Sequence, residues 1–177
     1  MFDLLIVSLW RRLAIAIAAN MVLVFACEVS PVSAGELVTL VTTVPPGTII
    51  VRTNERRLYL TVDHGRAIRY TVGVGRQGRQ WSGTSAIEAK FIQPNWVPPP
   101  EIRRDRPDLP DLIPGGSTAN PMGAAAMTLL GGVYAIHGTN APESIGGFVS
   151  YGCIRMLNAD ILELYAQVKV GTRVVVI

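Results

Sequence analysis

The clearest β-hairpin in the chain lies in residues 126–137, which read AMTLLGGVYAIH. Two largely apolar runs flank the pair Gly131-Gly132, and glycine adopts at low cost the positive φ angles that tight hairpin turns require. The second run ends in His137, so the pattern predicts a histidine at the end of a strand.

Alternating apolar and polar residues predict further strands before this hairpin. The pattern runs through residues 48–52, 57–62 and 67–74 and returns at 86–92. Such runs, rich in β-branched and aromatic residues, are typical of strands with one buried face. The stretch Asp63-His64-Gly65-Arg66 between two of them favours a tight turn. We therefore expect His64 to be a solvated turn residue.

One helix is predicted near the C-terminus. Asn158 is expected to be its N-cap, and Asp160 lies in its first turn. The apolar side chains at helical spacing are Ile161, Leu164, Tyr165 and Val168. Gly171 ends this segment, and residues 173–177 are predicted to form a last buried strand. The fold is therefore expected to be mainly β, a β-rich α+β domain with one main helix.

Residues 94–121 differ in character from the rest of the chain. They hold eight of the twelve prolines together with a cluster of charged side chains. Proline at this density is expected to prevent both a regular helix and a central strand. A connection of this length is either a working lid or a partly disordered insertion. Trp96 within it is expected either to face a substrate or to pin the loop to the core.

The composition indicates one folded domain and excludes several classes of function. The chain has 177 residues, 49% of them hydrophobic, and its 16 basic and 13 acidic side chains give a net charge of +3. It has no block of Lys and Arg and no interleaving of basic with aromatic residues, so no nucleic-acid partner is expected. Two cysteines and two histidines predict neither a disulfide framework nor a structural metal site.

The first 34 residues have the pattern of a secretory signal. Arg11 and Arg12 precede about 14 mostly apolar residues, and Val32-Ser33-Ala34 is typical of a signal-peptidase site. Export would place the protein in the periplasm or the cell envelope. Cleavage would leave a linker, residues 35–46, and a functional domain, residues 47–177.

Two alternatives for this N-terminal segment stay open. If it is not cleaved, the stretch up to Cys27 is expected to remain as a membrane anchor, and no other membrane contact is predicted. The residues before Cys27 also loosely resemble a lipoprotein site. With cleavage after Ala34, Cys153 becomes the one thiol of the exported protein. It is then either a small buried apolar residue or a nucleophile.

The residues around Cys153 favour the nucleophile. His137 stands 16 positions earlier, and a thiol becomes a useful nucleophile when an imidazole holds or accepts its proton. A strand end and a glycine-rich connection are able to bring the two side chains together. Gly152 permits close backbone approach, so the backbone amides of Gly152 and Cys153 are candidates to stabilise an oxyanion.

At these residues the sequence resembles the L,D-transpeptidase catalytic domain family, of the YkuD type. The matching motifs are His137-Gly138-Thr139 and Ser150-x-Gly152-Cys153-Ile154-Arg155-Met156, and the resemblance spans about residues 47–177. It implies a β-sandwich-like fold with one main helix after the cysteine. It also implies an exported enzyme that acts on peptidoglycan stem peptides and needs no cofactor.

The resemblance assigns roles residue by residue. Cys153 is the expected nucleophile, His137 the general base, and Gly138 supplies the backbone carbonyl that orients the imidazole. Arg155 is expected either to bind a substrate carboxylate or to form a structural ion pair. Further expected substrate contacts are Thr139 and Trp96.

Three neighbours of Cys153 are expected in supporting or oxyanion roles: Ser150, Tyr151 and Gly152. Ser150 is expected to stabilise the loop or to contact substrate. Tyr151 stands where many members of the family carry a second histidine, so it replaces a supporting group and is expected to alter the site. Residues 81–84, Trp-Ser-Gly-Thr, only loosely resemble the family's Thr-Pro-x-Gly segment, whereas residues 120–123 match its Asn-Pro-x-Gly segment.

The leading prediction is a peptidoglycan L,D-transpeptidase. Cys153 attacks the carbonyl of meso-diaminopimelate, the third residue of a donor tetrapeptide, releases D-alanine, and an acceptor amine then resolves the thioester. The acceptor stays open between another stem peptide, giving a 3–3 cross-link, the lysine of an envelope lipoprotein, and a D-amino acid. Hydrolysis of the same thioester would make the protein an L,D-carboxypeptidase. The remaining alternative, motivated by Tyr151, is a catalytically silent wall-binding module.

Overall fold

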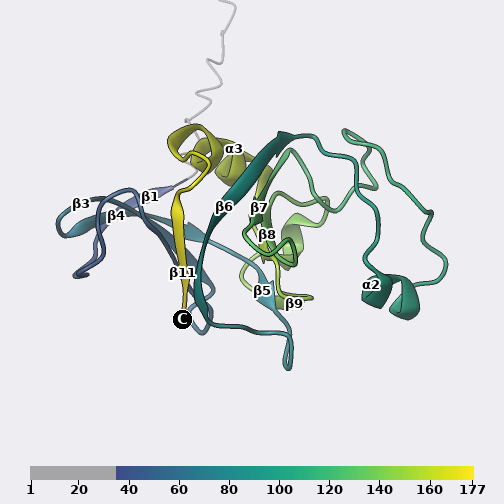
Figure 1. The fold of residues 1–177 in the computed structure, drawn as a ribbon, viewed down its shortest axis with the longest axis horizontal. Helices are drawn as coiled ribbons and strands as arrows, with labels where there is room; N and C mark the ends of the chain where they lie inside the picture. Colours follow the sequence, from purple (N-terminus) through teal and green to yellow (C-terminus); the bar gives the residue numbers. More distant parts are fainter. Residues whose placement is uncertain (1–34) are drawn as a thin grey trace, which may run out of the picture. The chain divides into compact units, whose positions relative to one another are not determined.

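The computed structural model describes residues 35–177, so the predicted signal or anchor segment lies outside the described residues. Strands dominate this part of the chain, together with two α-helices and one 3-10 turn (Figure 1). The elements in chain order are β1 (Glu36–Thr39), β2 (Ile49–Arg52), β3 (Arg57–Asp63), β4 (Arg66–Thr71), β5 (Val74–Gly75), β6 (Gly83–Ile92), α2 (Pro100–Asp105), β7 (Ala125–Leu129), β8 (Ala135–His137), η1 (Pro142–Ser144), β9 (Phe148–Ser150), β10 (Ile154–Arg155), α3 (Asn158–Gln167) and β11 (Arg173–Val176). The prediction of a mainly β domain with one main helix after Cys153 is confirmed.

Nine strands form one sheet in the order β1-β4-β3-β2-β11-β6-β7-β8-β10, and β5 pairs with β9 in a small second sheet. The long strand β6 belongs to both halves of the large sheet, because residues 83–86 pair with β11 and residues 87–92 pair with β7. The register shifts between Ile87 and Ala89, close to this change of partner, and such irregularities bend a strand. Side chains from both halves are buried together in one core.

The sheet formed by β2, β3 and β4 is buried on both faces, which differs from the prediction of one buried face. Ile49 and Val51 point into the main core, whereas Ile50 packs into a second cluster. Val38 and Leu40 help to form this second cluster, and β1 pairs with β4. Strand structure therefore begins inside the stretch expected to be a linker, because its apolar residues cover the outer face of the sheet.

The strand predicted over residues 67–74 is interrupted. Strand β4 ends at Thr71, and Val74 belongs to β5, which pairs with β9 rather than with the large sheet. Between them Gly73 exchanges two backbone hydrogen bonds with Arg155, each 2.8 Å from nitrogen to oxygen. The break therefore lets the chain leave its place between β1 and β3 and reach β10 at the other edge of the large sheet.

Helix α3 forms where it was predicted, but Asn158 is not its N-cap. Leu157 occupies that position without a side-chain hydrogen bond. The Asn158 carboxamide instead accepts hydrogen bonds from the backbone N–H groups of Ala124 and Thr139 and donates one to the Thr139 carbonyl. Three bonds to distant backbone groups outweigh the single local bond of a cap. Neither helix within residues 35–177 is long and apolar enough to cross a membrane.

The proline-rich segment 94–121 contains a short helix, α2, so the prediction that it holds no regular helix was wrong. Three of its eight prolines lie at 98–100, where the helix begins, and Pro100 stands at a first-turn position that proline tolerates. The next proline, Pro107, follows the end of the helix. Figure 1 shows α2 on a long connection that stands out from the sheets.

Candidate active site

The hairpin predicted at residues 126–137 is formed by β7 and β8, with φ angles of 95° at Gly131 and 69° at Gly132. His137 is the last residue of β8, as predicted. Strand β10 pairs with β8 in parallel, so that Arg155 lies opposite His137. The return of the chain to β8 therefore places the residues that follow Gly152 beside the histidine.

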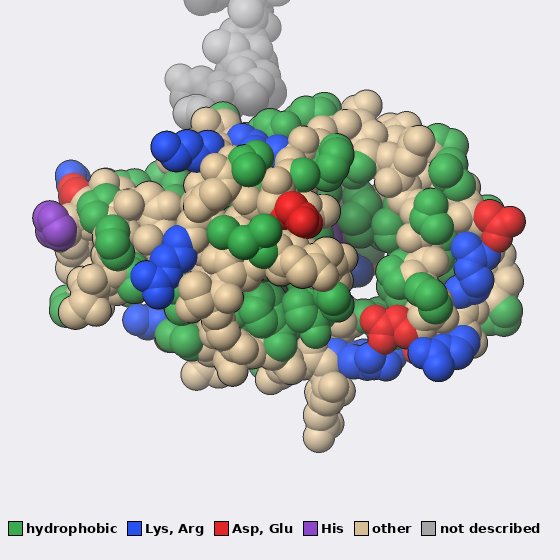
Figure 2. Space-filling view, viewed as in Figure 1, with side chains coloured by type: hydrophobic (Ala, Val, Ile, Leu, Met, Phe, Trp, Pro, Cys, Tyr) green, Lys and Arg blue, Asp and Glu red, His purple; other side chains and the backbone are tan. Residues whose placement is uncertain are grey.

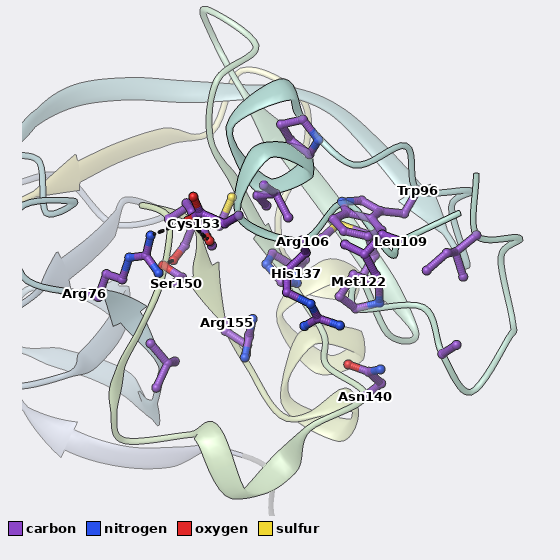
Figure 3. Close-up of a pocket in the computed structure, with 18 residues that line it drawn as sticks. Arg76, Trp96, Arg106, Leu109, Met122, His137, Asn140, Ser150, Cys153 and Arg155 are labelled. Carbon is purple, nitrogen blue, oxygen red and sulfur yellow. Dashed lines mark hydrogen bonds and ion pairs between the residues drawn. The ribbon is translucent and has the colours of Figure 1, made fainter. Parts of the chain in front are cut away.

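Alternation along β8 and β10 places three chemically active side chains on one face. Ile136 and Ile154 are paired across the two strands and are buried in the core. Their neighbours along the chain, His137, Arg155 and Cys153, therefore project to the opposite face. Figure 3 shows these three side chains around one cavity, which all three line.

The cavity has a volume of about 660 Å³ and lies between this sheet edge and the segment 94–121. We call the segment 94–121, which carries α2, the lobe, and the rest of the described domain the body. In Figure 2 the cavity is visible as a hollow between the two. The lobe contributes a largely apolar wall that includes Trp96, Ile102, Leu109 and Ile113. The segment expected to be a lid or an insertion is therefore an ordered wall of the candidate site.

The His137 imidazole is buried and held in one tautomer. Its Nδ1 lies 2.6 Å from the Gly138 carbonyl oxygen, and because a carbonyl only accepts, Nδ1 carries the proton and donates it. Burial, followed by the positive charge of Arg155, lowers the pKa of His137 to about 4. The backbone carbonyls of Gly138 and Pro121 act in the opposite direction. At neutral pH the ring is therefore uncharged, and with the proton on Nδ1 the basic lone pair lies on Nε2.

Cys153 is the free cysteine of the described residues and is partly exposed. Burial of its sulfur raises the pKa of the thiol, although a backbone hydrogen bond from Ala135 and the charge of Arg155 act in the opposite direction. The resting pair is therefore a neutral thiol and a neutral imidazole. In such a pair the proton leaves sulfur as the sulfur attacks, so the imidazole acts as a general base.

Ser150 organises the turn that presents Cys153. Its buried hydroxyl donates to the Cys153 carbonyl at 2.6 Å and accepts from the Gly152 N–H at 3.0 Å. The Gly152 N–H, one of the expected oxyanion donors, is therefore already used within the turn. Among the described residues no acceptor binds the Cys153 N–H.

Arg155 is largely buried beside the nucleophile, and burial lowers its pKa. Its Nη1 donates to the Ser144 hydroxyl at 3.0 Å, whereas its buried Nε has no partner in the described part of the chain. None of the ion pairs formed within residues 35–177 includes Arg155. A guanidinium that lines a cavity and forms no ion pair within residues 35–177 is suited to bind an anionic group of a ligand.

Tyr151 lines the cavity and bonds to the lobe. Its hydroxyl donates to Asp105 of α2, and Arg76 both pairs with that carboxylate at 3.0 Å and lies over the tyrosine ring, 4.0 Å from its centroid. Arg79 pairs with Glu101 of the same helix. The tyrosine hydroxyl and then Arg76 lower the pKa of Asp105. We name these five residues the clasp, because they tie the lobe to the body of the domain.

We expect Asp105→Ala to loosen the clasp. The clasp ion pairs are substantially exposed to solvent, and exposed ion pairs contribute little to stability. Removing the carboxylate also removes the tyrosine contact, so modification of Cys153 by a bulky maleimide should become about 3–10 times faster. Hydrogen exchange should accelerate in α2 as well. Asp108→Ala is the matched control, because Asp108 pairs with Arg106 inside the lobe; equal acceleration in both variants would refute the clasp.

Two other expected contacts have different positions. Trp96 lines the cavity, and its backbone exchanges two hydrogen bonds with Ile113 of the same proline-rich segment. Thr139 is buried, its hydroxyl accepts from the Ala141 N–H, and it does not line this cavity. His64 is exposed in the turn between β3 and β4, as predicted.

Several cavity residues were not found from the sequence, among them Arg76, Asp105 and Asn140. Arg76 lies in a glycine-rich turn, and Asp105 lies in a run of mixed charges. Charged residues on a solvated surface show the same patterns, so the sequence does not mark Arg76 or Asp105 as cavity residues.

The chain matches the family model for the L,D-transpeptidase catalytic domain over residues 46–176. Among curated proteins it is similar to ErfK/SrfK of Escherichia coli (strain K12), described as a probable L,D-transpeptidase, with 40% identity over 136 residues that cover 73% of this chain and 43% of the relative. The chain spans less than half the length of the curated relatives it matches.

Solved structures support the fold. An L,D-transpeptidase from Mycobacterium smegmatis has a TM-score of 0.58 at 19% identity and covers 73% of this chain and 58% of its own. A Brucella melitensis protein, described as a probable carnitine operon oxidoreductase, is 38% identical with a TM-score of 0.54, over 84% of this chain and 96% of its own. That description names a different activity, whereas the family model and the curated relatives agree with each other. On the match over residues 46–176, this chain belongs to the L,D-transpeptidase catalytic domain family.

Proposed function

We propose that this domain is a peptidoglycan L,D-transpeptidase in which Cys153 is the nucleophile and His137 the general base. The observation that carries the proposal is that His137, the last residue of β8, and Cys153, which directly precedes β10, line one cavity. Gly138 supports the proposal because its carbonyl holds the proton on Nδ1 and leaves Nε2 free. An uncharged imidazole with a free nitrogen is the form that a general base requires.

The reaction proceeds in two acyl transfers. In the first, Cys153 Sγ bonds to the diaminopimelate carbonyl carbon of a donor tetrapeptide while His137 Nε2 accepts the thiol proton. The carbon–nitrogen bond to D-alanine then breaks, and the imidazolium returns the proton to the leaving amine. In the second, an acceptor amine attacks the thioester, its proton passes through His137, and the thiol is regenerated. These steps need no cofactor.

Arg155 is assigned to a carboxylate of the donor. Its side chain lines the cavity on the same face as the nucleophile and forms no ion pair within residues 35–177, and stem peptides carry free carboxylates on diaminopimelate and on the terminal D-alanine. A charge-assisted bond from a guanidinium to such a group fixes the orientation of the donor. Trp96 and the apolar wall of the lobe would cover the peptide and exclude water.

The location and the acceptor are part of the proposal. Peptidoglycan lies outside the cytoplasm, so the domain acts in the periplasm or cell envelope after export by the N-terminal segment. The acceptor amine belongs to a second stem peptide, and a lipoprotein lysine provides the same chemistry. The opening between the lobe and the body gives such an amine a route to the thioester.

The test is intact-protein mass spectrometry of the protein incubated with a purified disaccharide-tetrapeptide, followed by chromatography of the products. We expect a covalent adduct on Cys153, release of D-alanine and formation of cross-linked dimers. A donor whose diaminopimelate carboxylate is amidated should react more slowly if Arg155 binds that group. Tripeptide without dimers would instead establish an L,D-carboxypeptidase, and unmodified protein with unchanged donor would support the silent wall-binding module.

A further inference from the structure

Side chains bind most of the backbone polar groups of Gly152 and Cys153. The hydroxyl of Ser150 accepts a hydrogen bond from the Gly152 N–H and donates one to the Cys153 carbonyl. The Gly152 carbonyl accepts a hydrogen bond from the indole Nε1–H of Trp81, at 2.9 Å. Three of the four backbone polar groups of this pair are therefore bound by side chains, and the Cys153 N–H remains without a protein acceptor among the described residues.

The indole that makes this bond is itself fixed in place. Trp81 stacks on Tyr134, with ring centroids 4.7 Å apart and an angle of 6° between the planes. Gly152 lies against this stack with a φ of 119°, and a Cβ at that position would lie 2.4 Å from Tyr134 Cε1. Glycine is therefore required at 152 both by the backbone conformation and by the aromatic stack.

Trp81 also has a direct physical route to the reacting atoms. The described chain contains no cis peptide, so the Gly152 carbonyl and the Cys153 N–H, which share one planar unit, point in opposite directions. A bond that fixes the carbonyl toward the indole thereby fixes the N–H away from it. Hydrogen bonding to the oxygen of an amide also polarises its N–H group.

We propose that Trp81 is a positioning residue for acyl transfer, which orients and polarises the Cys153 N–H as the donor to the oxyanion of the tetrahedral intermediate. This inference rests on the function proposed above, because an oxyanion forms only when the sulfur attacks a carbonyl. Donors aimed in advance at a developing oxyanion account for a large part of catalysis in acyl transfer. Trp81 is not among the residues that line the cavity, and it acts through the peptide unit to which its indole bonds.

The experiment compares two reactions of the same thiol in wild type and in Trp81→Phe. Acylation by a β-lactam forms an oxyanion, whereas alkylation by iodoacetamide displaces iodide and forms none. The phenylalanine ring can still stack on Tyr134 but lacks the N–H donor. We expect acylation to slow about tenfold, less than the roughly 10²–10³-fold loss on removal of an oxyanion donor, because the Cys153 N–H itself remains. Alkylation should stay within twofold of wild type.

Two further variants keep the test decisive. Benzothienylalanine at position 81 retains the two-ring shape and replaces only the N–H by sulfur, so it should reproduce the effect even if phenylalanine disturbs the stack. Tyr59→Phe is the control, because it removes one side-chain hydrogen bond, to Glu55, away from the cavity. It should leave both rates unchanged.

The possible outcomes separate this inference from the proposed function. A selective loss of acylation supports Trp81 as a positioning residue. An equal fall in both reactions would overturn it, because Trp81 would then act on the thiol or on the fold, and unchanged acylation would overturn it as well. A wild-type protein that is alkylated but accepts no acyl group from the β-lactam or the tetrapeptide would instead refute the proposed function itself.

Discussion

Cys153→Ala is expected to abolish acyl-enzyme formation and D-alanine release together. Cys153 is the free thiol of the described residues and lines the same cavity as His137, and in the proposed reaction no other group forms the acyl bond. Removal of the nucleophile of an acyl enzyme lowers turnover by about 10⁶-fold. Intact-protein mass spectrometry with the donor tetrapeptide should therefore detect no adduct, and chromatography should detect no released D-alanine.

The fold of this variant should be preserved. Cys153 lies outside the main core and is partly exposed, whereas Ile154 beside it is buried. Loss of one sulfur at a cavity wall leaves the Ser150 and Trp81 contacts in place, because both bind backbone groups. Cys153→Ser is the paired control, because it keeps a small polar group but lacks the thiolate. D-Alanine release by well-folded Cys153→Ala would eliminate the thioester mechanism.

Local patterns predicted the elements that carry the site, but not what surrounds them. The Gly131-Gly132 turn and the alternation around it suffice for the hairpin that ends in His137. The closeness of Cys153 to this histidine depends on parallel pairing of β10 with β8, and the spacing along the chain does not encode that pairing. It was the family motif rather than periodicity that linked the two residues.

Errors arose where long-range contacts replace local preferences. Asn158 has the residue type of an N-cap, yet its side chain bonds to backbone groups 19 and 34 residues away. Tyr151 reaches Asp105 across 46 residues, and Trp81 reaches Gly152 across 71. No window of sequence contains both members of such pairs. Helix α2 departs from the prediction for another reason: Pro99 and Pro100 lie at its start, and the first turn of a helix tolerates proline.

His137→Gln should change both the rate and the pH dependence of acylation. In the wild type, burial lowers the pKa of His137 to about 4, so the ring becomes protonated, and inactive as a base, only as the pH falls toward 4. The rate should therefore be nearly constant between pH 6 and 8. General base catalysis typically contributes 10²–10⁴-fold, so we expect a loss of about 10³-fold at pH 7 in the variant.

The variant should recover as the pH rises. Without a base, attack requires the thiolate, and burial raises the pKa of the Cys153 thiol. The thiolate fraction then increases about tenfold per pH unit up to that raised pKa. The deficit of the variant should shrink by the same factor, from about 10³-fold at pH 7 to about tenfold at pH 9. The measurement is the rate of β-lactam acylation from pH 5 to 10 in both proteins.

The shape of the two profiles distinguishes a neutral pair from a preformed ion pair. A thiolate–imidazolium pair in the resting protein would need a histidine pKa above that of the thiol, and the wild-type rate would then fall where the imidazolium loses its proton. Burial opposes such an ion pair, because it disfavours each charged form: it lowers the pKa of His137 and raises the pKa of Cys153. A flat wild-type profile with a steep variant profile supports His137 as a general base. Parallel profiles would show that His137 only holds the loop, and the base would have to be sought elsewhere in the cavity.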